Sequence, residues 1–318
     1  MYSGTRLSKY GDILAEKSGL GRTWIGLVLM ASVTSLPELV TGISSVTFAG
    51  VPEIAVGDVL GSCVFNLLIL ALLDALHKPM PISSSVHQGQ VLSAGFGILL
   101  LMVVAVSYYL TPHIPPIGWI GLYSIINIIL YFIAMRMVYF YEKRRVSEFI
   151  NEMAEELQYQ EISTKSAILN YLANAILVVI AASFLPGIGE KIAEMTGLGQ
   201  TFVGSFLIAL STSLPEIVVS VAAIRIGAAD MAIGNLFGSN LFNLLLLAID
   251  DLLFFKGPIL SHVSPSHIIS VYFAVIMTTI AIIGLTYRPK KKRFILSWDA
   301  MAILLSYVLY TGLLYAFR

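Results

Sequence analysis

Long apolar stretches separated by short polar intervals make up most of this chain. Nine of these stretches reach about 20 residues, the length of a helix that crosses a hydrocarbon core of about 30 Å. They cover residues 23–48, 53–76, 89–110, 116–139, 166–186, 201–224, 229–249, 266–287 and 297–316. The short alternating segments typical of membrane β-barrels are absent from the sequence. The pattern therefore predicts an all-α, multi-pass membrane protein.

Two of the stretches are interrupted in the middle by nearly the same polar segment. Residues 31–38 are Ala-Ser-Val-Thr-Ser-Leu-Pro-Glu, and residues 209–216 are Ala-Leu-Ser-Thr-Ser-Leu-Pro-Glu. Pro37 and Pro215 lack a backbone N–H, so each helix must kink or unwind there. A carboxylate follows each proline, and at mid-membrane depth it costs about 2.5–3.5 kcal/mol on insertion scales. Broken helices at corresponding positions of two halves indicate the binding site of a transporter.

The two halves of the chain repeat each other beyond these segments. An offset of 178 residues aligns the broken helices, and it also matches Ala15-Glu16 with Ala193-Glu194 and Gly19-Leu20-Gly21 with Gly197-Leu198-Gly199. An offset of 177 matches residues 57–66 with residues 234–243, both Gly-(Asp or Asn)-x-x-Gly-Ser-x-x-Phe-Asn. We therefore divide the chain into a first half, 1–140, a polar loop, 141–165, and a second half, 166–318.

The alignment leaves one helix of the second half without a counterpart. Span 166–186 precedes the second broken helix, and its partner in the first half would lie mostly before Met1. We therefore expect the complete protein to have a further apolar helix that ends near Tyr2. Each half would then hold five helices, and because five is odd the second half must insert upside down. The predicted fold is an inverted repeat of five plus five transmembrane helices, nine of them visible here, with the broken helices at its centre.

Composition and charge give the location and orientation of these helices. The chain is 57% apolar and 12% charged, whereas soluble domains carry about 25% charged residues. Sixteen of the 19 lysines and arginines lie in loops that follow odd-numbered helices of the complete plan, and basic loops stay cytoplasmic. We expect a protein of the cell membrane, surrounded by lipid, with the loop 141–165 in the cytoplasm.

The residues present also limit the cross-links, metal sites and partners of the chain. Cys63 is the single cysteine, so neither an internal disulfide nor a cysteine-based metal cluster can form. No basic, aromatic-interleaved surface suggests nucleic acid.

The polar residues of the repeats suit a hard cation. Residues four apart share one face of a helix, which pairs Thr34 with Glu38 and Thr212 with Glu216. An inverted pair of such helices can bring the two glutamates together near the membrane midplane. Two carboxylates surrounded by hydroxyl, amide and carbonyl oxygens suit calcium or sodium better than zinc or copper. Competition between calcium and sodium, or protons, for this site is then physically natural.

The two blocks V-T-S-L-P-E with G-S-C-V-F-N and S-T-S-L-P-E with G-S-N-L-F-N resemble the α-repeats of the sodium/calcium exchanger family. The resemblance covers both blocks and the five-plus-five plan. It implies a secondary antiporter, not an enzyme, that exchanges sodium for calcium by alternating access. It implies no cofactor, only the transported calcium and sodium ions, and we expect a monomer.

The resemblance also assigns roles to individual residues. Glu38 and Glu216 would be the principal calcium ligands, joined by Thr34 and Thr212. The sodium sites would be formed by Ser35, Ser62, Ser213 and Ser239 with the carbonyls of Ala31 and Ala209, and Asn66 and Asn243 would flank the central site. Val33 and Ser211 stand where relatives often have glycine, which bears on backbone flexibility. Asn243 stands where some relatives, including potassium-dependent ones, have aspartate, which favours potassium independence.

Three other functions compete with sodium/calcium exchange. A proton/calcium exchanger could use the same fold, but the Glu-His pairing of such relatives is absent at Phe65-Asn66 and Phe242-Asn243. An intramembrane aspartyl protease commonly has Gly-x-Gly-Asp, whereas Ala55-Val56-Gly57-Asp58 lacks the first glycine and no matching second aspartate is evident. A channel is disfavoured because a tight cage of two carboxylates suits occlusion better than rapid permeation.

Several aspartates receive no ligand role from the motifs. Asp58 is aligned with Asn235 in the repeat. It lies near the start of its span, where capping or solvation is as plausible as ion contact. Asp74, Asp250 and Asp251 lie near span ends, so we expect them to face water.

Overall fold

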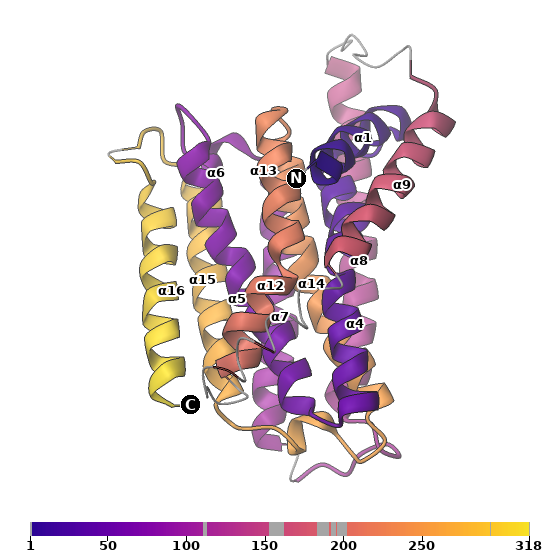
Figure 1. Ribbon diagram of the computed structural model, residues 1–318. Coiled ribbons are helices and arrows are strands. Elements are labelled where there is room, and N and C mark those ends of the chain that lie inside the picture. Colours follow the sequence, from indigo (N-terminus) through magenta and orange to yellow (C-terminus); the bar gives the residue numbers. More distant parts are fainter. Residues whose placement is uncertain are drawn as a thin grey trace.

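The computed structural model describes residues 2–110, 113–152, 162–182, 202–292 and 294–317, together with residues 191 and 195. The described part is a bundle of helices (Figure 1). Its only β feature is an isolated antiparallel bridge between Ile117 and Ile120. The predicted all-α membrane architecture is confirmed.

The nine predicted spans all fall on helices. The first becomes consecutive helical segments: α2 (Arg22–Trp24), η1 (Ile25–Met30), α3 (Ala31–Thr34), α4 (Leu36–Ser44) and η2 (Ser45–Ala49). The next four are α5 (Pro52–Leu76), α7 (Gly89–Leu110), α8 (Leu122–Glu152) and α9 (Thr164–Ala182). The second broken span is η3 (Val203–Ile208), α12 (Ala209–Thr212) and α13 (Leu214–Arg225), followed by α14 (Ala229–Leu253), α15 (His267–Tyr287) and α16 (Trp298–Ala316). Two short helices, α6 (Ile82–Ser85) and η4 (Ile259–Ser261), lie in loops.

Length and apolarity support spanning for most of these helices. Among the described residues, seven helices are long and apolar enough to cross a membrane, and the bent pair 205–212 and 214–225 forms an eighth span. Thr164–Ile180 is a shorter apolar helix. The end of the predicted span 166–186, and residues 193–194 and 197–199 of the repeat, lie outside the described residues.

The structure differs from the sequence-based expectation at both ends of the fourth span, where α8 continues to Glu152 rather than ending at residue 139, and at the N-terminus. The fourth span begins at Leu122 rather than at residue 116, because Gly118 adopts a left-handed φ of 68° in a turn after two prolines. Tyr2–Ser18 forms a further helix, α1, that none of the nine predicted spans covers. Its polar and charged residues hide it from a hydropathy pattern, yet it packs against α9 and α13 (Figure 1). The expected helix before Met1 lies beyond this sequence and stays a prediction.

The inverted relation of the halves is visible at the ends of α5 and α14. Asp74 accepts the backbone N–H of Ile82 at 2.8 Å, and Asp251 accepts that of Ile259 at 2.6 Å. Both acceptors lie eight residues before their donors. The other oxygen of each carboxylate accepts the N–H at the start of a helix of the opposite half, from Ser297 at 2.7 Å and Gly121 at 2.8 Å.

The loops that follow α5 and α14 lie at opposite ends of the bundle, as Figure 1 shows, so the two aspartates lie at opposite ends as well. The loop around Pro289 lies at the upper end with the loop after α5, where the Ser84 hydroxyl donates to the Pro289 carbonyl at 2.5 Å. The C-terminus lies at the lower end, where the Ser266 hydroxyl donates to the Phe317 carbonyl at 3.3 Å. Helices α5 and α14 therefore run in opposite directions, as an inverted repeat requires.

The expectation that Asp74, Asp250 and Asp251 face water is wrong. Each of the three side chains is at most 1% exposed. Asp74 also forms an ion pair with Lys292 at 3.1 Å, and Asp251 accepts hydroxyl hydrogen bonds from Tyr123 at 2.7 Å and Ser124 at 2.6 Å. The chain reversals fold back over the helix ends and supply donors, which a position near a span end does not reveal.

Helices α5 and α14 form the core of the bundle, and 83% of the most apolar part of each helix is buried. The spacing of glycines that these two helices share has a packing reason. A Cβ added to Gly61 would clash with the backbone of Ser205, and one added to Gly238 would clash with the backbone of Leu27. Ser205 and Leu27 are themselves 178 residues apart. Each core helix thus touches the broken helix of the other half backbone to backbone, as small-residue faces allow.

Candidate ion site

Both broken helices are interrupted at the serine that precedes Leu-Pro-Glu. Ser35 has φ −90° and ψ 11°, and Ser213 has φ −82° and ψ 5°, values that interrupt the helix for one residue. Pro37 and Pro215 then occupy the first turn of the next helix, where a missing N–H costs no hydrogen bond. The first span stays continuous over Arg22–Ala49, whereas the second bends by 47°. The predicted interruption is therefore present in both halves, with a sharp bend in the second.

The first half of the site is centred on Glu38, which is fully buried. The Ser62 hydroxyl donates to Glu38 Oε1 at 3.4 Å, and the Ser213 hydroxyl donates to the same oxygen at 3.5 Å. Ser62 also lies 3.4 Å from the Thr212 hydroxyl. The Thr212 hydroxyl in turn donates to Asp58 Oδ1 at 2.8 Å. Residues of both repeats thus alternate around this carboxylate.

The second half of the site has the same arrangement around Glu216, which is also fully buried. The hydroxyls of Ser239 and Ser35 each donate to Glu216 Oε1 at 3.1 Å. Ser239 lies 3.4 Å from the Thr34 hydroxyl. The Thr34 hydroxyl donates to Asn235 Oδ1 at 3.3 Å. Every residue here is the repeat counterpart of one in the first half.

The structure therefore brings together the predicted glutamates, threonines and serines, Glu38, Glu216, Thr34, Thr212, Ser35, Ser213, Ser62 and Ser239. All of these side chains are fully buried. It adds Asp58 and Asn235, which also are fully buried. Asp58 therefore neither caps its helix nor faces water. Its position four residues before Ser62, on the same helical face, was the available sequence signal.

The two predicted flanking asparagines differ in their partners. The Asn66 amide donates to Asn240 Oδ1 at 3.0 Å, and the Asn240 amide donates to the Cys63 carbonyl at 3.1 Å. Asn243 is fully buried, and its two polar side-chain atoms have no hydrogen-bond partner. Position 240 corresponds to Cys63 in the repeat, so Asn66 gains an amide partner across the halves that Asn243 does not have.

The carbonyls of Ala31 and Ala209 lie beside the interruptions, but they already accept hydrogen bonds. Ala31 accepts the Ser35 N–H at 3.0 Å and the Thr34 hydroxyl at 3.3 Å. Ala209 accepts the Ser213 N–H at 3.1 Å and the Thr212 hydroxyl at 3.2 Å. Their role as sodium ligands stays a prediction.

The remaining oxygens of the site have the chemistry of a cation cage. Glu38 Oε2 and Glu216 Oε2 are buried without a hydrogen-bond partner. Two ionised carboxylates that share one buried site repel each other. Within the described residues no three acidic, histidine or cysteine side chains form one metal-binding group. A cation held here therefore needs the serine and threonine oxygens in addition to the glutamates.

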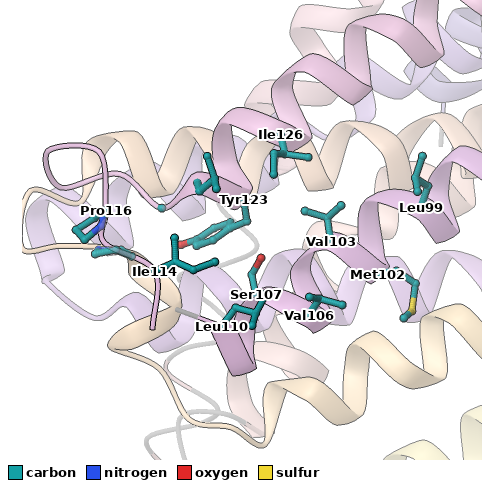
Figure 2. Close-up of a pocket in the computed structure, with 13 residues that line it drawn as sticks. Leu99, Met102, Val103, Val106, Ser107, Leu110, Ile114, Pro116, Tyr123 and Ile126 are labelled. Atoms are coloured by element: carbon teal, nitrogen blue, oxygen red, sulfur yellow. The ribbon is translucent and has the colours of Figure 1, made fainter. Parts of the chain in front are cut away.

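A separate hollow on the molecule has the wrong chemistry for ions. Figure 2 shows a groove of about 370 Å³ between α7 and α8, lined by side chains such as Met102, Val106 and Ile126. Its lining is almost wholly apolar, with Ser107 and Tyr123 as the hydroxyl-bearing exceptions. The ion site must therefore be sought in the polar centre of the bundle.

Comparison with known proteins places this arrangement in a family. The model of the family described as sodium/calcium exchanger protein matches residues 1–140 and 166–316. The chain belongs to this family. Members of the family are transporters that exchange ions, and the present chain is accordingly a multi-pass membrane protein of the cation/calcium exchanger type.

Individual relatives agree with this assignment. The inner membrane protein YrbG of Escherichia coli is 27% identical over 247 residues, which cover 78% of this exchanger-family chain and 74% of the relative. The sodium/calcium exchanger MaX1 of Methanosarcina acetivorans is 24% identical over 276 residues, covering 75% of both chains. A structure of the sodium-calcium exchanger NCX_Mj superimposes with a TM-score of 0.71 at 22% identity, over 98% of this chain and 93% of that one. The last similarity supports the inverted-repeat fold.

Proposed function

We propose that the protein exchanges sodium for calcium across the cell membrane by alternating access. The observation that supports this most is the crossed arrangement of the two glutamates. Ser35 of the first half donates to Glu216, and Ser213 of the second half donates to Glu38. Each carboxylate keeps one unpartnered oxygen. Movement of one half relative to the other would change both ligand sets together.

Glu38 and Glu216 are the proposed calcium ligands, completed by Thr34 and Thr212. Calcium takes six to eight oxygen ligands, which two carboxylates and nearby hydroxyls can supply with water. Sodium ions would use the serine oxygens of Ser35, Ser62, Ser213 and Ser239. Occupation by either cation relieves the repulsion between the glutamates, so the two ions compete for one set of charges.

Calcium uptake into liposomes that contain the purified protein tests the proposal. We expect uptake when sodium is trapped inside and diluted outside, because outward sodium movement drives inward calcium movement. An outward proton gradient without sodium serves as the comparison. Uptake driven by protons alone would overturn sodium coupling and leave a proton/calcium exchanger. Liposomes with the Glu38→Gln variant control for leakage.

A further inference from the structure

Asp250 is a buried carboxylate that takes no part in the site described above. It is 1% exposed, and neither of its side-chain oxygens has a hydrogen-bond partner. In the described part of the chain, no ion pair reaches Asp250. A buried charge without a partner is strongly unfavourable, so a cation or a proton must accompany it.

Gly42 of α4 makes the space into which Asp250 points. A Cβ added to Gly42 would lie 2.6 Å from Asp250 Oδ1 and 2.8 Å from Asp250 Cγ. Any side chain at position 42 would therefore displace this carboxylate. The carboxylate lies against the backbone of α4, one helical turn after the site residue Glu38.

The repeat relates Asp58 of α5 to the same space. Its Oδ1 accepts the Thr212 hydroxyl, whereas its Oδ2 is buried without a partner. In the other half the counterpart Asn235 donates its amide to the Ser220 hydroxyl at 3.1 Å. Ser220 is the repeat counterpart of Gly42. If the halves correspond here as they do at the threonines, Oδ2 of Asp58 is directed toward the space at Gly42 that Asp250 occupies.

We propose that Asp58 and Asp250 form a second cation position beside the central site, in the space that Gly42 opens. The proposal rests on the proposed function in one respect, namely that cations reach this region through the central site. Asp58 links the second position to the central site, because hydrogen bonds run from Asp58 through Thr212 and Ser62 to Glu38.

Sodium fits this position better than calcium. The unpartnered carboxylate oxygens number three, Asp58 Oδ2 and the two of Asp250, whereas calcium takes six to eight oxygen ligands. Carboxylate oxygens are hard ligands, which excludes preference for a soft metal. The other half has no such position, since Asn235, Ser220 and Leu73 stand at the places of Asp58, Gly42 and Asp250.

Equilibrium binding of radioactive sodium to the purified full chain in detergent tests the second position. The Asp250→Asn variant should bind one sodium ion fewer per chain than the unmodified protein. Its calcium affinity at the central site should change by less than about threefold, as for separate sites with weak coupling. Asp230→Asn, at the opposite end of the same helix, is the matched control and should bind sodium and calcium as the unmodified protein does.

A second variant removes both aspartates of the proposed cation position and replaces them with the residues that occupy the corresponding positions in the other half. Gly42→Ser combined with Asp250→Leu and Asp58→Asn copies the residues of the other half, and it should show the same loss of one sodium ion. Monodispersity and thermal melting in detergent check that it folds.

Unchanged sodium stoichiometry in both Asp250→Asn and the triple variant would overturn the second position and leave the two aspartates protonated. If the unmodified protein binds calcium under those conditions, the proposed function survives that result. Failure of the unmodified protein to bind either ion would overturn both proposals.

Discussion

The two halves of the ion site share a backbone plan but differ in charge. Around Glu38 the path of hydrogen bonds runs through Ser62 and Thr212 to Asp58, a carboxylate. Around Glu216 it runs through the counterparts of these residues to an amide, Asn235. The threonine bond is 2.8 Å long to the carboxylate and 3.3 Å to the amide. A charge-assisted bond is shorter and stronger than a neutral one.

This difference separates what symmetry supplies from what individual residues supply. The repeat places two glutamates and four serines in equivalent positions, which is sufficient for a central cage. The substitutions at three paired positions, Asp58 with Asn235, Gly42 with Ser220 and Cys63 with Asn240, then give the halves different polar surroundings. An inverted repeat can therefore keep one common set of oxygen-bearing side chains and still give its two sides different polar surroundings.

Replacement of the glutamates tests what the halves have in common and should have the largest effect. Glu38→Gln and Glu216→Gln keep the side-chain shape but each removes one of the two charges that we propose hold calcium. Removing one partner of a buried charge interaction costs about 3–5 kcal/mol, so calcium uptake should fall about a hundredfold or more. Liposome flux measures this, with Asp230→Asn as control. Undiminished flux in both glutamine variants would contradict the assignment.

Replacement of the threonines tests the difference between the halves. Thr212→Val leaves Asp58 Oδ1 without its donor, whereas Thr34→Val removes a bond to a neutral amide. Hydrogen bonds to charged groups contribute about 1.5–3 kcal/mol and neutral ones about 0.5–1.5 kcal/mol, so Thr212→Val should destabilise the protein more. Melting in detergent without added calcium measures both. The exposed Thr286, which bonds back to its own helix, gives the control variant Thr286→Val.

Equal melting temperatures for Thr34→Val and Thr212→Val would mean that Asp58 is not ionised in the folded protein. The two halves would then carry the same charge at the paired positions of Asp58 and Asn235.

Replacement of the crossing serines should have the smallest effect. Ser35 lies 3.1 Å from Glu216, and Ser213 lies 3.5 Å from Glu38 but also bonds to Ser62 at 3.1 Å. Ser35→Ala should therefore lower sodium affinity by about 1.5 kcal/mol, or about tenfold, through the loss of its bond to a carboxylate. Ser213→Ala should lower it less. Sodium dependence of calcium uptake distinguishes the two, and a larger effect of Ser213→Ala would reverse the expected order.

Most of the fold was accessible from the sequence because hydropathy and the repeat report directly on membrane spans. The same repeat predicted that Glu38 and Glu216 meet, since two inverted copies of one broken helix must cross. The sequence pattern missed α1, whose polar residues pack against other helices rather than lipid. It predicted an interruption in both broken spans but not that the 47° bend lies in the second, because both copies carry the same Leu-Pro-Glu.

The aspartates show why the remaining parts of the site were not accessible. Asp74 and Asp251 look like residues at span ends, and only the loops that fold over them make them buried. Asp58 gains its meaning from Thr212, a contact between residues 154 positions apart. The position of the Asp250 carboxylate depends on the absence of a side chain at Gly42. A hydropathy pattern does not report which residue of another helix fills that space.

The pairing of Asp74 with Ser297 has a consequence for how the protein is made. These residues lie 223 positions apart, so the carboxylate at the end of α5 waits for its partner until the last helix has been synthesised. Asp251 meets Gly121, which has been present since much earlier in translation. The second half can thus be completed as it emerges from the ribosome, while the first half is sealed last. A chain interrupted before α16 would leave Asp74 without the Ser297 N–H, and its carboxylate would have an unmet hydrogen bond at the end of α5.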